Sequence, residues 1–447
     1  MAPSRDTIFA LSSAPGRAAI AVIRVSGPQA GEALLRLRRG RALPKPRQAA
    51  YARLADPLSG AGLDDGLVLW FPGPASETGE DMAEFQIHGG RATVASVLEA
   101  LGKLAGLRPA APGEFTRRAF ANGKLDLTAV EGLADLVNAE TEAQRRQALR
   151  QLRGELGQLY EGWRARLLRL LAHGEAAIDF PDETAEEGIE RDRSHNILGL
   201  IKEISQHLGD NRRGELLRDG LSLVILGAPN VGKSSLMNVL ARRDVAIVSE
   251  RAGTTRDVIE VHLDLAGYPV VIADTAGLRE TGDEIELEGV KRARARAEHA
   301  DLRIVLLDAT SWPKIPAHVA PLFGPTSLLV LNKIDKRRPT GRLEVSGHPL
   351  HPVSALTGEG MDELVRALAR LAHERLALAE APSLTRLRHR QALESCVEAL
   401  QRSLSAALPE LAVEDLRLAL REIGRITGRV DVEDLLDVIF RDFCIGK

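Results

Sequence analysis

One stretch decides the fold of the domain around it: Gly227–Ser235, with the sequence GAPNVGKSS, matches the phosphate-binding loop pattern G-x-x-x-x-G-K-[ST]. Its glycines let the backbone curl until successive N–H groups point at one anion, while Lys233 reaches the terminal phosphates and Ser234 holds Mg²⁺. The apolar run 221–226 predicts a buried strand before the loop, and residues 235–240 begin a helix whose N-terminus adds a positive dipole. This context favours a nucleotide site over a chance match, without identifying the nucleotide.

Four further stretches narrow the nucleotide to GTP. The sequence DTAG at 274–277 ends a predicted strand, so its aspartate approaches Mg²⁺ through water and its last N–H meets the γ-phosphate. The loop GTTRD at 253–257 offers a threonine that coordinates Mg²⁺ only when the γ-phosphate is present. In NKID at 332–335 the aspartate accepts hydrogen bonds from guanine N1–H and the 2-amino group, a pair that adenine lacks, and Ser354-Ala355 contacts the O6 edge. Together and in this order, the motifs predict GTP rather than ATP.

The residue that follows DTAG leaves the mechanism of hydrolysis open. Ras-type proteins position the attacking water with a glutamine here, whereas this chain has Leu278, which cannot do so. From its spacing alone, the acidic run at 283–288 is the solvated start of a helix. Positive charge for the transferring phosphoryl group could come from Arg251, Arg256 or Arg279, or from a bound cation.

Composition bounds the class of protein. A chain of 447 residues predicts two to four domains, at ~150 residues each. A net charge of −3 gives no global basic field, and an aromatic content of 3% argues against an extended base-stacking RNA platform. Two cysteines imply no disulfide framework and favour a reducing compartment, the cytoplasm. With no secretory pattern and no apolar run near the ~20 residues of a membrane span, we expect no membrane association.

Sequence patterns divide the chain into four segments. Residues 1–118 are mixed α/β, with strands at 18–25, 67–71 and 84–88 and a helix over 92–107. Residues 119–217 and 378–447 are helical, and residues 218–377 alternate strands and helices, as a parallel, doubly wound sheet does. We therefore predict a multidomain α/β protein with a G domain inserted into a helical domain. The G-domain strands are expected at 221–226, 258–265, 269–273, 302–308 and 327–331, with a last helix over 361–372.

Apolar side chains at three- and four-residue steps from Leu149 to Leu170 predict one long helix. Seven arginines lie along it. We interpret them as a solvated face beside interspersed acids, because charge runs are usually solvated. A phosphate-contacting face for tRNA is the alternative. The seven are Arg145, Arg146, Arg150, Arg153, Arg164, Arg166 and Arg169.

Motifs outside the G domain carry a resemblance to one family. Near the N-terminus PGR at 15–17 precedes IRVSG at 23–27, and the last five residues, 443–447, are FCIGK. Between them lie TGED at 78–81, HGG at 88–90, PGEFTRRAF at 112–120 and KLDL at 124–127. With these motifs the chain resembles, along nearly its whole length, the bacterial and organellar tRNA-modification GTPases of the MnmE (TrmE) family.

The resemblance implies a function and partners. The family hydrolyses GTP and, with the flavoprotein MnmG, which carries FAD, adds a 5-carboxymethylaminomethyl or aminomethyl group to the wobble uridine (U34) of tRNA. A tetrahydrofolate derivative, in the 5,10-methylene or 5-formyl form, is the expected one-carbon donor. The N-terminal domain would bind folate and form the homodimer, and a heterotetramer with MnmG is expected. The alternatives are a regulatory switch GTPase of the ribosome-assembly type and a folate enzyme that does not need its G domain.

The resemblance also implies roles that the residues alone leave open. In the family, K⁺ bridges two dimerising G domains in place of an arginine finger. The water-orienting glutamate aligns with Glu286 and its supporting arginine with Arg279, which replaces our interpretation of the acidic run as solvated. The implied K⁺ ligands are Asn230, Ser249, Arg251 and Thr254, and the Mg²⁺ ligands are Ser234 and Thr255. The predicted GTP contacts are Asn230, Val231, Gly232, Lys233, Ser234, Ser235, Ser249, Thr254, Thr255, Asp274, Thr275, Ala276, Gly277, Asn332, Lys333, Asp335, Ser354 and Ala355.

The folate contacts carried over from the family are Arg24, Glu84, Lys124 and Lys447. Cations suit the carboxylates of a glutamate tail, and a carboxylate suits the ring N–H groups of a pterin. Taken singly, each is also compatible with an ordinary surface ion pair. The resemblance keeps Cys444 beside this site, which is compatible with a chemical role, although we do not predict a nucleophile.

Overall fold

Contacts within the chain group it into two compact units, which are described separately. The first unit comprises residues 1–134, 151–173 and 416–447, and the second comprises 135–150 and 174–415. No helix in the described part of the chain is both long and apolar enough to cross a bilayer. The computed structural model describes residues 6–179, 187–243, 245–247, 260–273, 300–316, 319–324, 326–341, 343–377 and 382–430, and also 436, 439, 440, 443 and 446.

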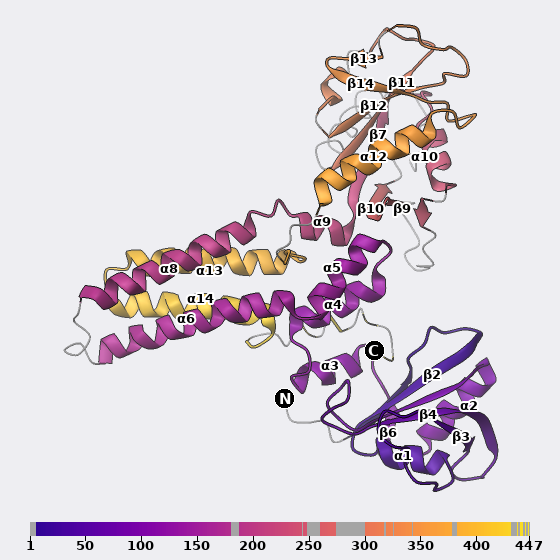
Figure 1. Cartoon of the computed structure of the whole chain (residues 1–447), viewed down its shortest axis with the longest axis vertical. Coiled ribbons are helices and arrows are strands. Elements are labelled where there is room, and N and C mark those ends of the chain that lie inside the picture. Colours follow the sequence, from indigo (N-terminus) through magenta and orange to yellow (C-terminus); the bar gives the residue numbers. More distant parts are fainter. Residues whose placement is uncertain are drawn as a thin grey trace, which may run out of the picture. The chain divides into compact units, whose positions relative to one another are not determined.

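A six-stranded sheet begins the first unit (Figure 1). The strand order is β3-β4-β5-β2-β1-β6, antiparallel except for the β1–β6 pair. Helix α1 buries one face against this sheet, since its apolar residues recur at three- and four-residue steps. The elements are β1 (Thr7–Leu11), β2 (Ala18–Ser26), α1 (Ala30–Leu37), β3 (Ala50–Ala55), β4 (Gly62–Phe71), β5 (Met82–Gly89), α2 (Arg91–Gly102) and β6 (Leu107–Pro109).

The bounds predicted from the sequence are wrong for two helices. The helix expected over 92–107 ends at Gly102, because residues 107–109 pair with β1 as strand β6. The single long helix expected from Leu149 to Leu170 is two helices, α5 (Glu142–Leu152) and α6 (Glu155–Asp179). They separate at Gly154, whose φ of +85° interrupts helical geometry while the apolar spacing continues past it.

The C-terminal part of the chain completes the first unit. Helix α14 (Pro409–Thr427) ends before Gly428, where a Cβ would lie 2.7 Å from the Phe120 ring. Phe440 and Phe443 pack with Leu127 in a small core. The other helices here are α3 (Glu114–Ala121) and α4 (Leu127–Asn138).

The second unit contains an eight-stranded sheet of order β13-β14-β12-β11-β7-β10-β9-β8. Its five central strands, from β14 to β10, are parallel, and antiparallel pairs extend it at both edges. Four predicted strands are confirmed, and the fifth, 258–265, is described from Glu260. The strands are β7 (Leu221–Gly227), β8 (Ala246–Ile247), β9 (Glu260–Leu265), β10 (Tyr268–Ala273), β11 (Leu302–Asp308), β12 (Ser327–Asn332), β13 (Glu344–Val345) and β14 (His348–Pro352).

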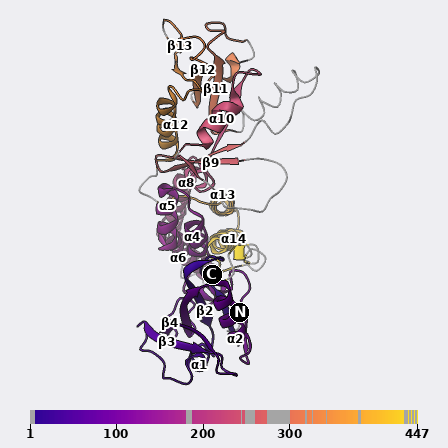
Figure 2. The same ribbon diagram turned by 90° about the vertical axis from the view of Figure 1, so that its right-hand side faces the viewer.

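Helices α10 (Lys233–Ala241) and α12 (Met361–Leu376) share one core with one face of this sheet, and both lie beside it in Figure 2. Alternate residues of β11 and β12 face the opposite side and pack into a second core. Outside the sheet, α8 (Glu187–Leu208) packs on α13 (Leu387–Ser405), and α9 (Arg213–Asp219) leads into β7. Such a layered parallel sheet places its loops at the carboxyl ends of the strands, where nucleotide sites form.

Candidate functional site

The loop between β7 and α10 has the backbone that a phosphate cradle requires. Gly227 and Gly232 have φ angles of +149° and +105°. A Cβ would lie 2.6 Å from the Leu306 carbonyl oxygen at the first position and 2.3 Å from the Asn332 amide nitrogen at the second. Only glycine fits either place. Helix α10 begins directly afterwards, at Lys233, so its N-terminal N–H groups and dipole add to the cradle.

Lys233 and Ser234 begin helix α10 directly after the glycine cradle. Lys233 Nζ donates to the carbonyl oxygens of Gly227 and Ala228, both at 3.1 Å, which holds the ammonium over the loop. Ser234 is exposed on the first turn of α10. These residues, with the glycine cradle, fit a Mg²⁺-bound triphosphate.

Asn332 connects two of the predicted motifs. Its side chain is only 2% exposed. Its amide donates to the Val231 carbonyl oxygen at 2.9 Å, and its side-chain oxygen accepts from the Ala355 N–H at 3.0 Å. The phosphate loop and the base-recognition loop are thus joined by one buried side chain.

The predicted guanine-reading pair is also in contact. Ser354 Oγ donates to Asp335 Oδ1 at 2.5 Å and accepts from the Thr357 N–H at 3.1 Å. These bonds fix the orientation of the Asp335 carboxylate and still leave its second oxygen available as an acceptor. An oriented acceptor is what recognition of guanine N1–H and its 2-amino group requires.

Asp308 is a supporting residue that the sequence reasoning missed. It ends β11 and pairs with Lys333 Nζ at 2.7 Å, and the same ammonium donates to the Asn230 carbonyl oxygen at 2.6 Å. Burial pushes the Asp308 pKa upward, but hydrogen bonds from Lys333 and Thr310 outweigh it, so the pKa lies below its usual value. Its place at the end of a strand next to the NKID strand was the available signal.

Ten of the predicted G-domain residues lie outside the part of the chain that the structure describes. Among the described residues, no three His, Cys, Asp or Glu side chains gather as a metal cluster. Lys447 and Cys444, predicted beside the folate site, also lie outside the described residues. The ten G-domain residues are Ser249, Arg251, Thr254, Thr255, Asp274, Thr275, Ala276, Gly277, Arg279 and Glu286.

A separate polar cluster lies in the first unit, on the sheet. Arg24 and Glu84 are cross-strand neighbours on β2 and β5, and the Arg24 Nε donates to Glu84 at 2.8 Å. Glu77, which the sequence reasoning missed, pairs with the same guanidinium at 2.7 Å. Lys124 Nζ donates to the Pro74 carbonyl oxygen at 2.9 Å.

The C-terminal tail reaches the same sheet. Ser12 Oγ donates to the Gly446 carbonyl oxygen at 2.9 Å, and a Cβ on Gly446 would lie 2.2 Å from the Leu11 carbonyl oxygen. Leu11 is next to Ala10, the cross-strand partner of Arg24. Gly446 is therefore held one strand away from Arg24.

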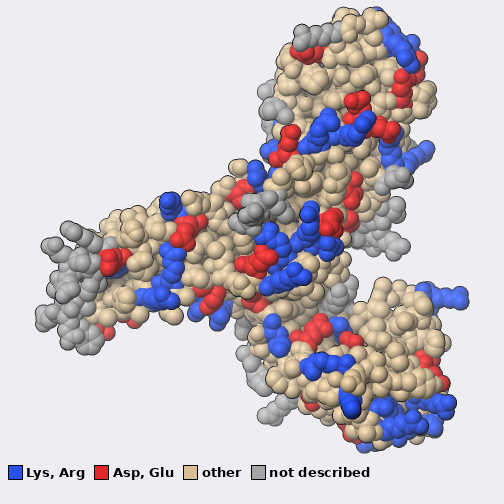
Figure 3. All heavy atoms as spheres, in the orientation of Figure 1, with Lys and Arg blue, Asp and Glu red and all other residues tan. Residues whose placement is uncertain are grey.

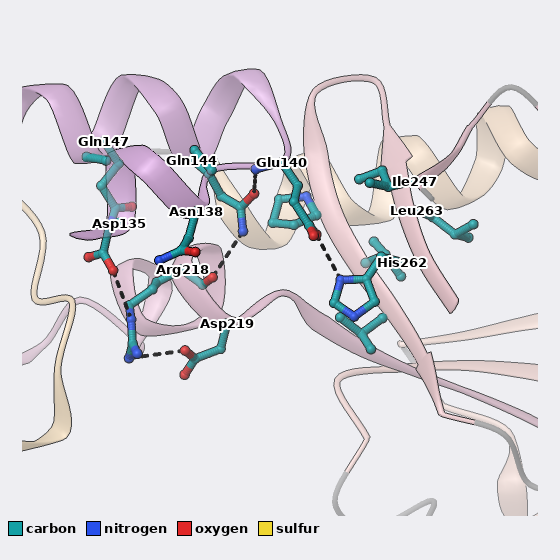
Figure 4. A pocket seen from close by; sticks show the side chains of 15 residues that line it. Asp135, Asn138, Glu140, Gln144, Gln147, Arg218, Asp219, Ile247, His262 and Leu263 are labelled. Carbon is teal, nitrogen blue, oxygen red and sulfur yellow. Dashed lines mark hydrogen bonds and ion pairs between the residues drawn. The ribbon is translucent and has the colours of Figure 1, made fainter. Parts of the chain in front are cut away.

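A pocket of about 250 Å³ in the second unit lies between α5 and the β9–β10 hairpin (Figure 4). Its charged groups pair with each other: Glu140 with His262 at 2.8 Å, and Arg218 with Asp135 at 3.4 Å. Gln144 donates to the Arg218 carbonyl oxygen at 3.0 Å. Because these side chains pair with each other, the pocket is lined by polar contacts that connect the helix to the hairpin.

Two family models together match nearly the whole chain. The family model for the GTP-binding protein TrmE N-terminus matches residues 7–124, and the one for the MnmE helical domain matches residues 127–444. A tRNA modification GTPase MnmE of Paramagnetospirillum magneticum is 56% identical over 444 residues, covering 99% of this chain and 100% of that protein.

A mitochondrial protein is also similar to this chain along nearly its whole length. The human mitochondrial protein named 5-taurinomethyluridine-[tRNA] synthase subunit GTPB3 is 52% identical over 464 residues, covering 99% of this chain and 94% of that one. A solved structure, the G domain of the T. maritima FeoB iron transporter, is 26% identical with a TM-score of 0.26, covering 34% of this chain and 98% of that chain. The similarity in sequence thus extends along the whole chain and beyond the G domain.

Proposed function

The chain belongs to the MnmE family of tRNA-modification GTPases, and from that premise we propose that it hydrolyses GTP to drive modification of the wobble uridine (U34) of tRNA. The observation that carries the GTP part is the buried Asn332 side chain, which joins the phosphate loop to the guanine-reading loop. The tRNA part is supported by relatives named for tRNA modification that match nearly the full length of this chain.

The proposed hydrolysis depends on K⁺ and on dimerisation of G domains. Asn230 would hold K⁺ with Ser249, Arg251 and Thr254, and the ion would supply the positive charge that an arginine finger gives elsewhere. In support, the Asn230 side chain is exposed, while its backbone is fixed by the bond from Lys333 to its carbonyl oxygen. Mg²⁺ would be held by Ser234 and Thr255, and it neutralises phosphate charge when bound.

Glu286 is proposed to orient the attacking water, with Arg279 supporting it. The reason is the residue after DTAG: Leu278 has no group that could accept a proton or a hydrogen bond from water. Another acceptor is needed, and the resemblance to the family assigns that role to Glu286.

The proposed one-carbon donor is a tetrahydrofolate derivative bound in the first unit by Arg24, Glu84, Lys124 and Lys447. Two observations support it: Arg24 and Glu84 are paired on adjacent strands, and the tail is anchored at Gly446, one residue before Lys447. We further propose that the chain acts as a cytoplasmic homodimer with the flavoprotein MnmG, whose FAD performs the redox chemistry. Cys444 is not assigned a step.

The test is GTP hydrolysis by the purified protein in K⁺ and in Na⁺ buffer of equal ionic strength, with dimerisation in aluminium fluoride followed in parallel. Strong activation by K⁺ that is lost in Asn230→Ala, and a low rate in Glu286→Ala, are the expected results. Equal rates in the two salts would contradict the cation-bridged mechanism and favour a regulatory switch that needs an outside activator.

Folate binding is tested separately, by titrating 5-formyltetrahydrofolate into the wild type, Arg24→Ala and the control Arg53→Ala. Arg53 is also a sheet arginine of the first unit, but it faces solvent away from Arg24's strand. We expect binding to be lost only in Arg24→Ala. Equal binding by all three proteins would remove Arg24 from the folate site.

A further inference from the structure

We propose that the loop between α1 and β3, with the outward face of β3, is a tRNA-binding surface. Residues 33–55 carry seven Lys or Arg and no Asp or Glu, in a chain whose net charge is −3. Figure 3 shows Lys and Arg gathered at the end of the first unit where Figure 1 draws α1 and β3. We define the α1–β3 surface by Arg39, Arg41, Lys45, Arg47, Tyr51 and Arg53, all of which are exposed.

Four of the five cations of this surface have no carboxylate partner among the described residues, and the fifth, Arg53, lies 3.9 Å from Asp65. The side chains of Arg41 and Lys45 form no hydrogen bond or ion pair with the described residues. Arg39 donates to the Gly60 carbonyl oxygen at 2.7 Å and Arg47 to that of Ala75, so both keep their full charge. Burial lowers the pKa of neighbouring Arg38, and the positive charge of Arg41 adds to this effect. A polyanion would relieve the repulsion between these two cations.

The arginines of α5 and α6 differ from these cations because acidic neighbours pair with them. Arg145 makes two hydrogen bonds of 2.8 Å to Glu142, and Arg164 pairs with Glu161 at 2.9 Å. Arg146 also lies 3.7 Å from Glu142. These pairs support a solvated, self-neutralised face, so the α1–β3 surface is the better site for phosphates.

An aromatic side chain extends the basic surface. Tyr51 is 58% exposed, and no other Phe, Tyr or Trp in the described part of the chain is exposed. It alternates with buried neighbours along β3, so it shares the outward face of this edge strand with Arg53. A hydrogen bond of 2.9 Å to Asp65 fixes the ring at its hydroxyl end. A single fixed ring beside cations suits stacking by one unpaired base, not an extended platform.

RNA fits this surface better than an anionic membrane does. Membrane-binding basic segments insert large apolar side chains between their cations. Residues 38–49 expose none, since Leu43 is half-buried and the other exposed apolar residues are alanine and proline. The choice of tRNA among RNAs rests on the proposed function.

The experiment measures tRNA binding by the full chain at several salt concentrations. The main variant is Arg41→Glu with Lys45→Glu, since neither side chain holds the fold together. The charge-matched control is Arg366→Glu with Arg370→Glu, two exposed arginines of α12. We expect the main variant to lose about tenfold or more in affinity and to flatten the slope of log K against log [salt] by about 1 to 2, as loss of one or two phosphate contacts does. The control should match the wild type.

Tyr51 is tested in the same assay. Tyr51→Ala should weaken binding about tenfold with an unchanged salt slope, whereas Tyr51→Phe, which keeps the ring, should bind nearly as the wild type does. Circular dichroism and thermal unfolding like those of the wild type confirm that each variant is folded. If the wild type binds tRNA and the Arg41/Lys45 variant binds equally well, or if only binding to phosphatidylserine vesicles is lost, the surface is misassigned. If the wild type does not bind tRNA at all, the proposed function itself fails.

Discussion

Asn332 donates its side-chain amide to the Val231 carbonyl oxygen at 2.9 Å, across a separation of 101 residues. The bond ties the strand end that we propose to read the base to the loop that we propose to hold the phosphates. Since the same side chain accepts from the Ala355 N–H, three motifs that are far apart in sequence share one buried group.

We expect Asn332→Ala to weaken GTP binding and lower thermal stability. It leaves the Val231 carbonyl and the Ala355 N–H without this partner, and each buried unsatisfied group costs about 1–3 kcal/mol. Calorimetric titration should show affinity for GTP reduced at least tenfold, with ~1.4 kcal/mol per factor of ten. Asn332→Asp keeps the acceptor for Ala355 but not the donor for Val231. Its affinity for GTP should therefore lie between those of the wild type and Asn332→Ala. Wild-type affinity in Asn332→Ala would show that the bond has no role in the site.

Much of the G domain could be predicted from sequence because its motifs are local. Gly227 and Gly232 predict a tightly turned backbone because glycine tolerates such geometry. The apolar runs of β7, β11 and β12 are continuous, as in strands buried on both faces. The pairing of Ser354 with Asp335 follows once both lie at adjacent strand ends. These features need little knowledge of the rest of the chain.

Features that depend on long-range packing could not be predicted. The apolar spacing from Leu149 to Leu170 continues through Gly154, so periodicity alone misses the break between α5 and α6. Nothing near Gly446 indicates that it lies against Leu11, because that contact joins opposite ends of the chain. Short strands such as β1 and β6 are recognisable only through their partners.

We expect the second unit to lose stability between pH 6.5 and about 4 because of His207. Burial is the main cause that lowers its pKa from 6.5 to about 4, and nearby His389 and Arg390 add to it against the attraction of Asp210. As pH falls below 6.5, the unfolded chain binds a proton that the folded chain refuses. Stability then falls by up to about 1.4 kcal/mol per pH unit.

Urea unfolding of His207→Gln at pH 7.5, 6 and 5 checks this. The variant should lose less stability on acidification than the wild type does. His173→Gln, at an exposed position on α6, is the control and should retain the wild-type pH dependence. A His207→Gln profile parallel to that of the wild type would contradict a depressed pKa.

Gly446→Ala should impair folate binding while leaving GTP hydrolysis intact. The residue has φ of +100°, and an added Cβ would lie 2.2 Å from a backbone oxygen of β1, so the tail must move away from the sheet. We expect affinity for 5-formyltetrahydrofolate to fall about tenfold or more, because displacement of Lys447 would remove the charge-assisted bond that we propose for it. Gly123→Ala is matched to it: φ is +68°, and a Cβ there has no neighbour within 4 Å. Equal affinity in Gly446→Ala and Gly123→Ala would show that the tail is not part of the folate site.

The Glu140–His262 pair should couple the nucleotide to the helices. The β9–β10 hairpin begins three residues after GTTRD and ends one residue before DTAG, so both stretches that we propose to contact the γ-phosphate continue into it in sequence. Its tip is held to α5 by the Ala143 N–H, which donates to the Gly267 carbonyl oxygen at 3.0 Å, and its side by the 2.8 Å contact of Glu140 with His262. A shift of either stretch on hydrolysis would therefore move the start of α5.

His262→Ala and Glu140→Ala should each lower tRNA modification several-fold, with GTP hydrolysis within about twofold of the wild type. The double variant should be no worse than either single one, because both remove the same contact and a double-mutant cycle then reports coupling. Arg243→Ala breaks a different ion pair of the G domain, with Asp362, and serves as the control. Two results would contradict this coupling: additive losses of tRNA modification in the double variant, or an equal loss in the control. The hairpin contact would then only support the fold, and GTP hydrolysis would be coupled to the helices through other contacts.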